Sequence, residues 1–187
     1  RSDPASPVPY DFPMRASRDK AYMVADQRFA AGRPDVLCFT TEPLAGDVTF
    51  AGGIRAVLQA AISTTDADFV VKLIDVWPDN TEYPGYQMLV RGDIMRGRYR
   101  RSFSAPEPFT PGEPTEVAFT MPDIAHTFRK GHRIMVQVQS SWFPLADRNP
   151  QQFVDIYRCA ASDFIPCDVR IYHDRRRPSR LEVLRLR

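Results

Sequence analysis

The chain has 187 residues, of which 43% are hydrophobic and 26% charged, and its formal net charge is +2. This length is typical of one domain with one core, because a domain of about 150 residues buries roughly 70% of the surface of its unfolded chain. The absence of any run of about 18 apolar residues argues against a helix that spans a membrane. The small, scattered charge argues against a nucleic-acid partner.

The opening segment, residues 1–9, is rich in proline and has no hydrophobic periodicity, which is typical of a connector. We interpret residues 1–30 as a connector from an N-terminal domain that this sequence does not contain. Residues 31–187 are interpreted as one folded domain. A short helical turn is expected at 22–29, beside the connector, and another at 147–153.

Short runs rich in Val, Ile, Leu and Phe recur between turn signals from residue 35 onward. The run at 69–77 is apolar on both faces, so it should lie in the middle of a sandwich. Such spacing, in a chain with 17 prolines, predicts an all-β fold: a β-sandwich of jelly-roll (galactose-binding-like) type with few short helices. The expected strands are 35–40, 47–51, 54–63, 69–77, 86–95, 97–104, 116–121, 134–140, 169–173 and 181–186.

Two local patterns refine this prediction. Arg96, Arg98 and Arg100 are two residues apart, so we interpret them as the solvent-facing side of one strand and not as a basic binding patch. Residues 121–131 are interpreted as a loop with a turn at Gly131, because the next alternating run begins only at Ile134.

The cysteines and acidic residues give no strong signal for a metal or a cofactor. Cys38, Cys159 and Cys167 lack the C-x-x-C spacing of zinc sites, and a Cys159–Cys167 disulfide fits them no better than free buried thiols do. The pairs Asp66 with Asp68 and Asp75 with Asp79 could supply oxygens to Ca²⁺, but solvated loop carboxylates explain them more simply. We therefore predict no metal and no cofactor.

The residues of a serine hydrolase site are also missing. Such a site needs a nucleophile on a G-x-S-x-G elbow, and the nine glycines form no such motif. His126, His132 and His173 have no activated nucleophile beside them, and each is expected to donate a hydrogen bond to a backbone carbonyl. We predict no catalytic residue in this chain.

Aromatic residues at strand ends and in loops are the remaining candidates for a functional role. Interface cores are enriched in Trp, Tyr and Arg, which favours contacts that pair Trp77 with Tyr86 and Trp142 with Arg148. Internal packing explains the same residues equally well. The candidate residues for an interdomain or pocket-wall contact are Trp77, Tyr86, Trp142, Phe143 and Arg148.

Several motifs, in order along nearly the whole chain, resemble one family. They include Asp-Val-Trp-Pro-Asp at 75–79, the block from His126 to Pro150 with Ser-Ser-Trp-Phe-Pro at 140–144, and Tyr-His-Asp at 172–174. The chain is similar to the C-terminal β-module of the serine hydrolases that include cocaine esterase, α-amino-acid ester hydrolase, glutaryl-cephalosporin acylase and X-Pro dipeptidyl-peptidase.

This resemblance implies a partner: an N-terminal α/β-hydrolase domain with a Ser-His-Asp triad that cleaves small esters or amides. The module would stabilise that domain, shape its pocket and help to assemble a homo-oligomer. Two alternatives stay open, namely a carbohydrate- or ligand-binding jelly-roll module without a hydrolase partner, and a structural sandwich that associates with itself. The compartment stays undetermined.

Overall fold

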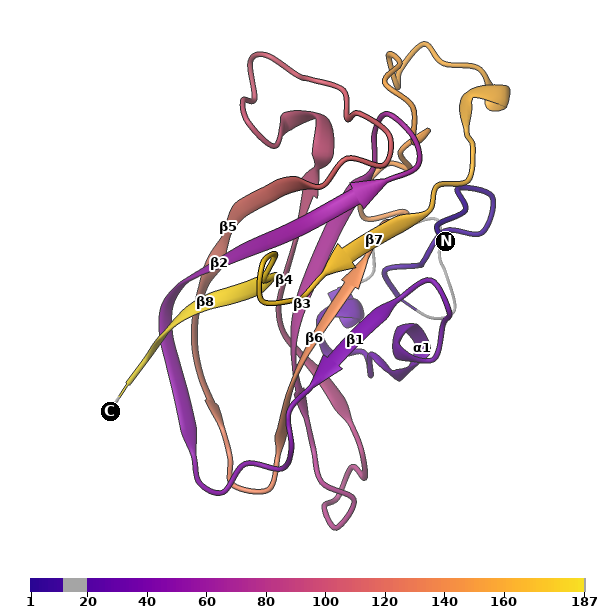
Figure 1. Ribbon diagram of the computed structural model, residues 1–187. Coiled ribbons are helices and arrows are strands. Elements are labelled where there is room, and N and C mark those ends of the chain that lie inside the picture. Colours follow the sequence, from indigo (N-terminus) through magenta and orange to yellow (C-terminus); the bar gives the residue numbers. More distant parts are fainter. Residues whose placement is uncertain (12–19, 187) are drawn as a thin grey trace.

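The computed structural model describes residues 1–11 and 20–186. Figure 1 shows two antiparallel sheets facing each other, with short helical segments to one side. The elements are η1 (Lys20–Val24), α1 (Arg28–Ala31), β1 (Leu37–Thr40), β2 (Val48–Ile62), β3 (Asp68–Val76), β4 (Gln87–Arg96), η2 (Gly97–Tyr99), β5 (Thr115–Phe128), β6 (Arg133–Gln139), η3 (Ala161–Asp163), β7 (Val169–Tyr172) and β8 (Arg180–Arg185).

The strand order is β1-β6-β3-β4 in the first sheet and β5-β2-β7 in the second, where β8 also pairs with β2. Apolar side chains from both sheets form the main core, among them Phe69, Val71 and Leu73 of β3 and Ile54 of β2. The prediction of an all-β sandwich is confirmed, and this antiparallel arrangement is compatible with a jelly roll. The prediction for 69–77 is also confirmed, because β3 is buried on both faces between β6 and β4.

The outer face of the first sheet is covered by the N-terminal part of the chain. Val70 of β3 packs there with Tyr10 and Trp142 in a second, smaller apolar cluster. The backbone of Ser2 exchanges two hydrogen bonds with that of Cys167, and Tyr10 N donates to Phe143 O at 2.9 Å. The first residues of the chain are therefore part of the packing of the sandwich.

Glycine and proline change two of the predicted boundaries. The expected strands 47–51 and 54–63 form the single strand β2, because Gly52 adopts φ 103° and accommodates a register shift before Ile54. The predicted loop at 121–131 is wrong as far as Phe128, since β5 continues through Pro122. A proline is tolerated there because β5 is an edge strand.

The expected strand at 97–104 and the helical turn at 147–153 are both wrong. Gly97 N donates to Ala67 O at 2.8 Å, so the chain leaves the sheet and enters η2. Residues 147–153 form no helix; Gln151 N donates to the Asn149 side chain, and Gln151 has φ 64°. Short helices do occur around the expected 22–29, as η1 and α1. No helix within the described residues is long and apolar enough to cross a membrane.

Candidate functional site

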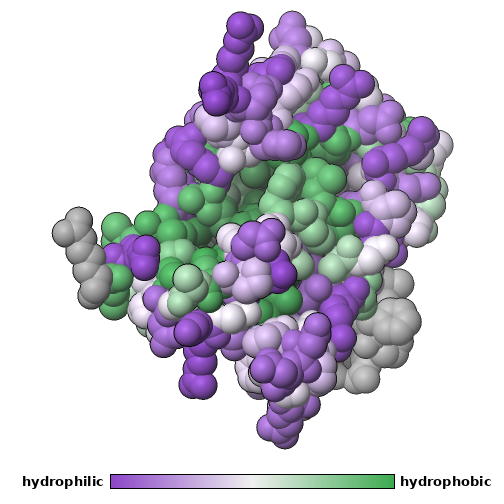
Figure 2. All heavy atoms as spheres, turned by 60° about the horizontal axis from the view of Figure 1, so that its bottom comes forward, coloured by the Kyte–Doolittle hydropathy of each residue, from purple (hydrophilic) through white to green (hydrophobic). Residues whose placement is uncertain are grey.

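An open side of the sandwich exposes apolar residues between β1 and β6 of the first sheet and β7 and β8 of the second. We call this surface the apolar groove. It encloses about 110 Å³ and is lined mainly by Phe39, Leu58, Val136, Val138, Ile171 and Leu181. Leu37 borders a neighbouring hollow that shares Val138 and Ile171 with the groove. Figure 2 shows a broad, hollowed apolar area with a hydrophilic border.

Some of these apolar side chains are more exposed than is usual for a surface that faces only solvent. Leu37 and Phe39 of β1 are each 39% exposed. Burying a side chain of this size contributes about 1.5–3 kcal/mol, and large exposed apolar patches mark sites of interaction. The apolar groove is therefore the candidate docking surface of this chain.

A second group of aromatic rings lies at the end of β3. The Trp77 ring contacts the rings of Tyr86, His132 and Tyr83, with centroids 5.5, 5.7 and 6.0 Å away. Tyr86 Oη donates to Val24 O at 2.7 Å, and partial burial raises the pKa of its phenol. The structure thus brings together Trp77 and Tyr86, which the sequence had paired, and leaves both partly exposed.

Asp75 joins two histidines beside this aromatic group. His126 Nε2 on β5 and His132 Nδ1 before β6 lie 2.9 and 2.8 Å from the two oxygens of the buried Asp75 carboxylate. Both histidines were expected to donate to backbone carbonyls, which is wrong because the turn between β5 and β6 brings both toward β3. A carboxylate orients an imidazole in this way, and a cavity of about 360 Å³ adjoins the group.

The other three candidate residues lie elsewhere. Trp142 is 6% exposed and packs inside the chain, where a Cβ on Gly92 would come within 2.9 Å of its ring. Arg148 does not pair with Trp142 as expected; its guanidinium lies 5.5 Å from the centroid of the Phe143 ring and donates to Pro4 O at 2.8 Å. These five residues therefore form no single cluster.

Lys72 is a buried cation that sequence reasoning did not single out. Its Nζ donates to Gln27 Oε1 at 2.9 Å and lies 5.5 and 5.7 Å from the ring centroids of Trp142 and Phe29. Burial lowers the pKa of this ammonium to about 7. The signal in the sequence was a lone lysine in the otherwise apolar run 69–74.

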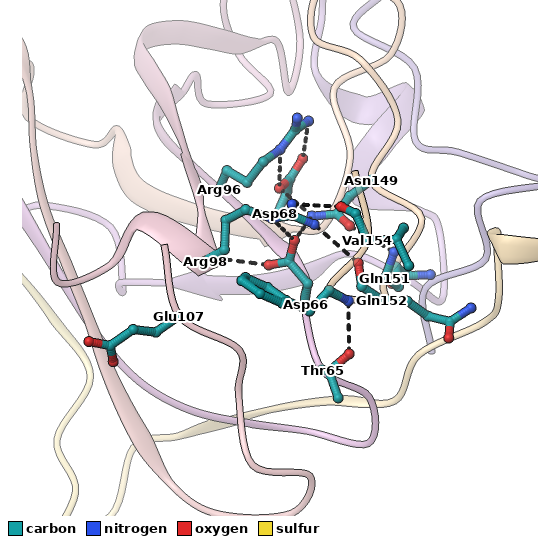
Figure 3. A network of polar contacts seen from close by, with 12 residues as sticks. Thr65, Asp66, Asp68, Arg96, Arg98, Glu107, Asn149, Gln151, Gln152 and Val154 are labelled. Carbon is teal, nitrogen blue, oxygen red and sulfur yellow. Dashed lines mark hydrogen bonds and ion pairs between the residues drawn. The ribbon is translucent and has the colours of Figure 1, made fainter. Parts of the chain in front are cut away.

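A network of buried ion pairs holds the long loop that follows Trp142 (Figure 3). Arg98 Nε donates to Asp66 at 2.7 Å and Arg96 Nε to Asp68 at 3.1 Å. Asn149 Nδ2 donates to both carboxylates, and Arg98 also donates to Gln152 O and Val154 O. Burial raises the pKa of Asp68, which Arg96 and Asn149 oppose.

This network corrects two expectations from the sequence. Arg96 and Arg98 do not face solvent from a strand; they neutralise Asp66 and Asp68, and Arg100 stacks on Phe109. The interpretation of Asp66 and Asp68 as solvated loop carboxylates is also wrong, because both are buried and accept hydrogen bonds from these arginines and from Asn149. Asp75 is likewise engaged by two histidines. Within the described residues, no group of three or more His, Cys, Asp or Glu could hold a metal ion, and the three cysteines are free thiols.

Domains similar to this chain occur within larger known enzymes. The chain is 42% identical over 147 residues to cocaine esterase of Rhodococcus sp. (strain MB1 Bresler). The match covers 79% of this chain and 25% of that protein. The crystal structure of an aminopeptidase from a marine sediment Thaumarchaeota archaeon matches all of this chain and 32% of its own, with 42% identity and a TM-score of 0.94. An α-amino acid ester hydrolase matches 97% of this chain and 31% of its own, with 46% identity and a TM-score of 0.93.

The chain thus spans about a quarter to a third of the length of these relatives. Residues 14–182 match the sequence model of one family, which is described as the X-Pro dipeptidyl-peptidase C-terminal non-catalytic domain. The chain therefore belongs to the family of X-Pro dipeptidyl-peptidase C-terminal non-catalytic domains.

Proposed function

We propose that this domain docks, through its apolar groove, on the α/β-hydrolase catalytic domain of a serine hydrolase that cleaves esters or amides. The apolar groove carries the proposal, because Leu37 and Phe39 at its border are each 39% exposed and exposed apolar surface of this kind marks sites of interaction. The relatives support such a partner, because the part of each that matches this chain is only about a quarter to a third of a hydrolytic enzyme.

The role of the domain is to stabilise the catalytic domain and to help close one wall of its substrate pocket. Docking buries Leu37 and Phe39, which contributes to the free energy of association. Trp77 and Tyr86 are the residues we propose for a contact at the pocket wall, since both are partly exposed and held in place by their neighbours. The nucleophile and its triad belong to the catalytic domain, and a homo-oligomer stays a prediction.

The experiment uses three samples: this chain, the catalytic domain of the same hydrolase, and both together. We expect p-nitrophenyl ester hydrolysis by the mixture, weak hydrolysis by a less stable catalytic domain alone, and none by this chain. Phe39→Asp should weaken association at least tenfold, because it places a charge in the apolar groove. Tyr157→Asp is the matched control, since Tyr157 is 83% exposed outside the groove. Serine-reagent-sensitive hydrolysis by this chain, or equal effects of both variants, would refute the proposal.

A further inference from the structure

A cavity of about 610 Å³ opens on the side of the sandwich opposite the apolar groove. It lies between the edge strands β4 and β5 and is bordered by the segment that follows η2. Ile94 and Met95 of β4 and Phe119 of β5 supply apolar surface to it. Its volume falls within the roughly 300–1,000 Å³ of typical small-molecule sites.

The border of this cavity is rich in arginine. Arg96 is neutralised by Asp68, and the exposed Arg101 pairs with Glu107 at 2.9 Å. The one acidic residue among the lining residues, Asp93, accepts a hydrogen bond from the backbone of Ile94. The cavity thus combines apolar walls with positively charged groups on one border.

Arg100 differs from its neighbours because its guanidinium donates to main-chain carbonyls, those of Gly97, Glu107 and Pro108. Its Nε is buried without a hydrogen-bond partner, and among the described residues no carboxylate forms an ion pair with it. Burial, and then the charge of Arg101, lower the pKa of Arg100. An anion beside this guanidinium would offset both effects, because a nearby negative charge favours the charged form.

Phe103 adds an exposed aromatic ring at the same border. Its side chain is 79% exposed and stacks on Tyr99, with ring centroids 6.2 Å apart and planes 28° apart. Both rings line the cavity. They offer a planar apolar surface next to the arginines, which suits a ligand that carries an aryl group beside its charge.

We propose that this cavity binds an amphipathic carboxylate, whose apolar or aryl group lies against Ile94, Met95 and Phe119 while its carboxylate accepts hydrogen bonds from Arg101 and from the one Nη2 hydrogen of Arg100 that no main-chain carbonyl accepts. Arginine suits this role because its planar fork matches the two oxygens of a carboxylate. The site is independent of the proposed docking function, since it uses neither the apolar groove nor a catalytic domain.

The test is an NMR titration of the ¹⁵N-labelled 187-residue chain with 3-phenylpropionate. We expect saturable shifts of the amide signals in β4, in residues 97–103 and around Phe119. The uncharged 3-phenylpropionamide should bind about tenfold more weakly, because it loses the charge-assisted hydrogen bonds. Acetate, which lacks the ring, should not saturate at the same concentration. Absent or non-saturable shifts, equal affinity for acid and amide, or shifts confined to the apolar groove would overturn the proposal.

Two variants with opposite expected effects sharpen the test. Arg101→Gln should weaken binding by about three- to tenfold, whereas Glu107→Gln should strengthen it by a similar factor by releasing Arg101 from its carboxylate partner. Both side chains lie at the surface, so the fold should persist. Arg158→Gln is the matched control, because Arg158 is an exposed arginine that does not line the cavity. If all three variants bind with equal affinity, the arginine border does not recognise the ligand and the proposal fails.

Discussion

Replacement of Lys72 by methionine should remove most of the pH dependence of stability between pH 7 and 10. Lys72 is fully buried on the outer face of the first sheet, and burial lowers its pKa from 10.5 to about 7. Between these two pH values the unfolded chain holds the proton and the folded chain does not, so stability rises with pH. The penalty for Lys72 is about 4 kcal/mol at pH 7 and about 1 kcal/mol at pH 10, a gain of roughly 3 kcal/mol.

The methionine side chain is one atom shorter than that of lysine and has no charge to desolvate. The substitution leaves Gln27 Oε1 without its donor. This costs about 1–3 kcal/mol of stability at every pH and so does not change how stability depends on pH. The assay is urea unfolding of the wild type, Lys72→Met and Lys130→Met at several values from pH 7 to 10. We expect the rise in the wild type and in Lys130→Met, whose lysine is exposed, and a nearly flat profile in Lys72→Met. A rise of wild-type size in Lys72→Met would refute the reasoning.

Three further predictions concern the buried network, the turn at η2 and the apolar groove. Asp66→Asn should cost about 3 kcal/mol and speed proteolysis at 149–154, because it leaves Arg98 without its buried carboxylate; Asp155→Asn, at an exposed pair, should cost under about 0.5 kcal/mol. Gly97→Ala should cost about 1–3 kcal/mol in urea unfolding, since its Cβ would lie 2.6 Å from Ala67 O. Gly46→Ala, with no atom within 4 Å, should be nearly neutral, and equal losses would contradict the clash. Dye binding to exposed apolar surface should fall in Phe39→Asp and stay unchanged in Tyr157→Asp if the apolar groove is the open surface.

Much of the fold could be predicted from local patterns. The strands β3 and β6 were predicted correctly, the first from an apolar run on both faces and the second from alternation. Both signals are local, because side chains alternate across a strand whichever strand lies beside it. The family could also be recognised, since its motifs are short runs in a fixed order. The expected strand at 97–104 was wrong because a backbone group found a partner from a distant segment, as Gly97 N did with Ala67 O. The expected helical turn at 147–153 was wrong because of a local contact, between Gln151 N and the Asn149 side chain.

The candidate site was less predictable. Trp77 and Tyr86 were correctly paired, because adjacent antiparallel strands bring their ends together. Lys72, the Asp75 group and Arg96 depend on segments 28 to 57 residues apart in the chain. Trp142 shows the same limit, since its burial depends on Gly92 and Tyr22.

The sequence by itself determined an all-β domain of a known hydrolase family, because hydrophobic periodicity and turn residues act over a few residues. The tertiary structure alone decided which charges are neutralised and which apolar residues stay uncovered. Arg96 and Arg98 looked like a solvent-facing stripe until the fold set them against Asp68 and Asp66. The apolar groove could not be seen either, because Phe39 and Leu181 are ordinary strand residues and only the order of the strands in the two sheets leaves the edge between them open.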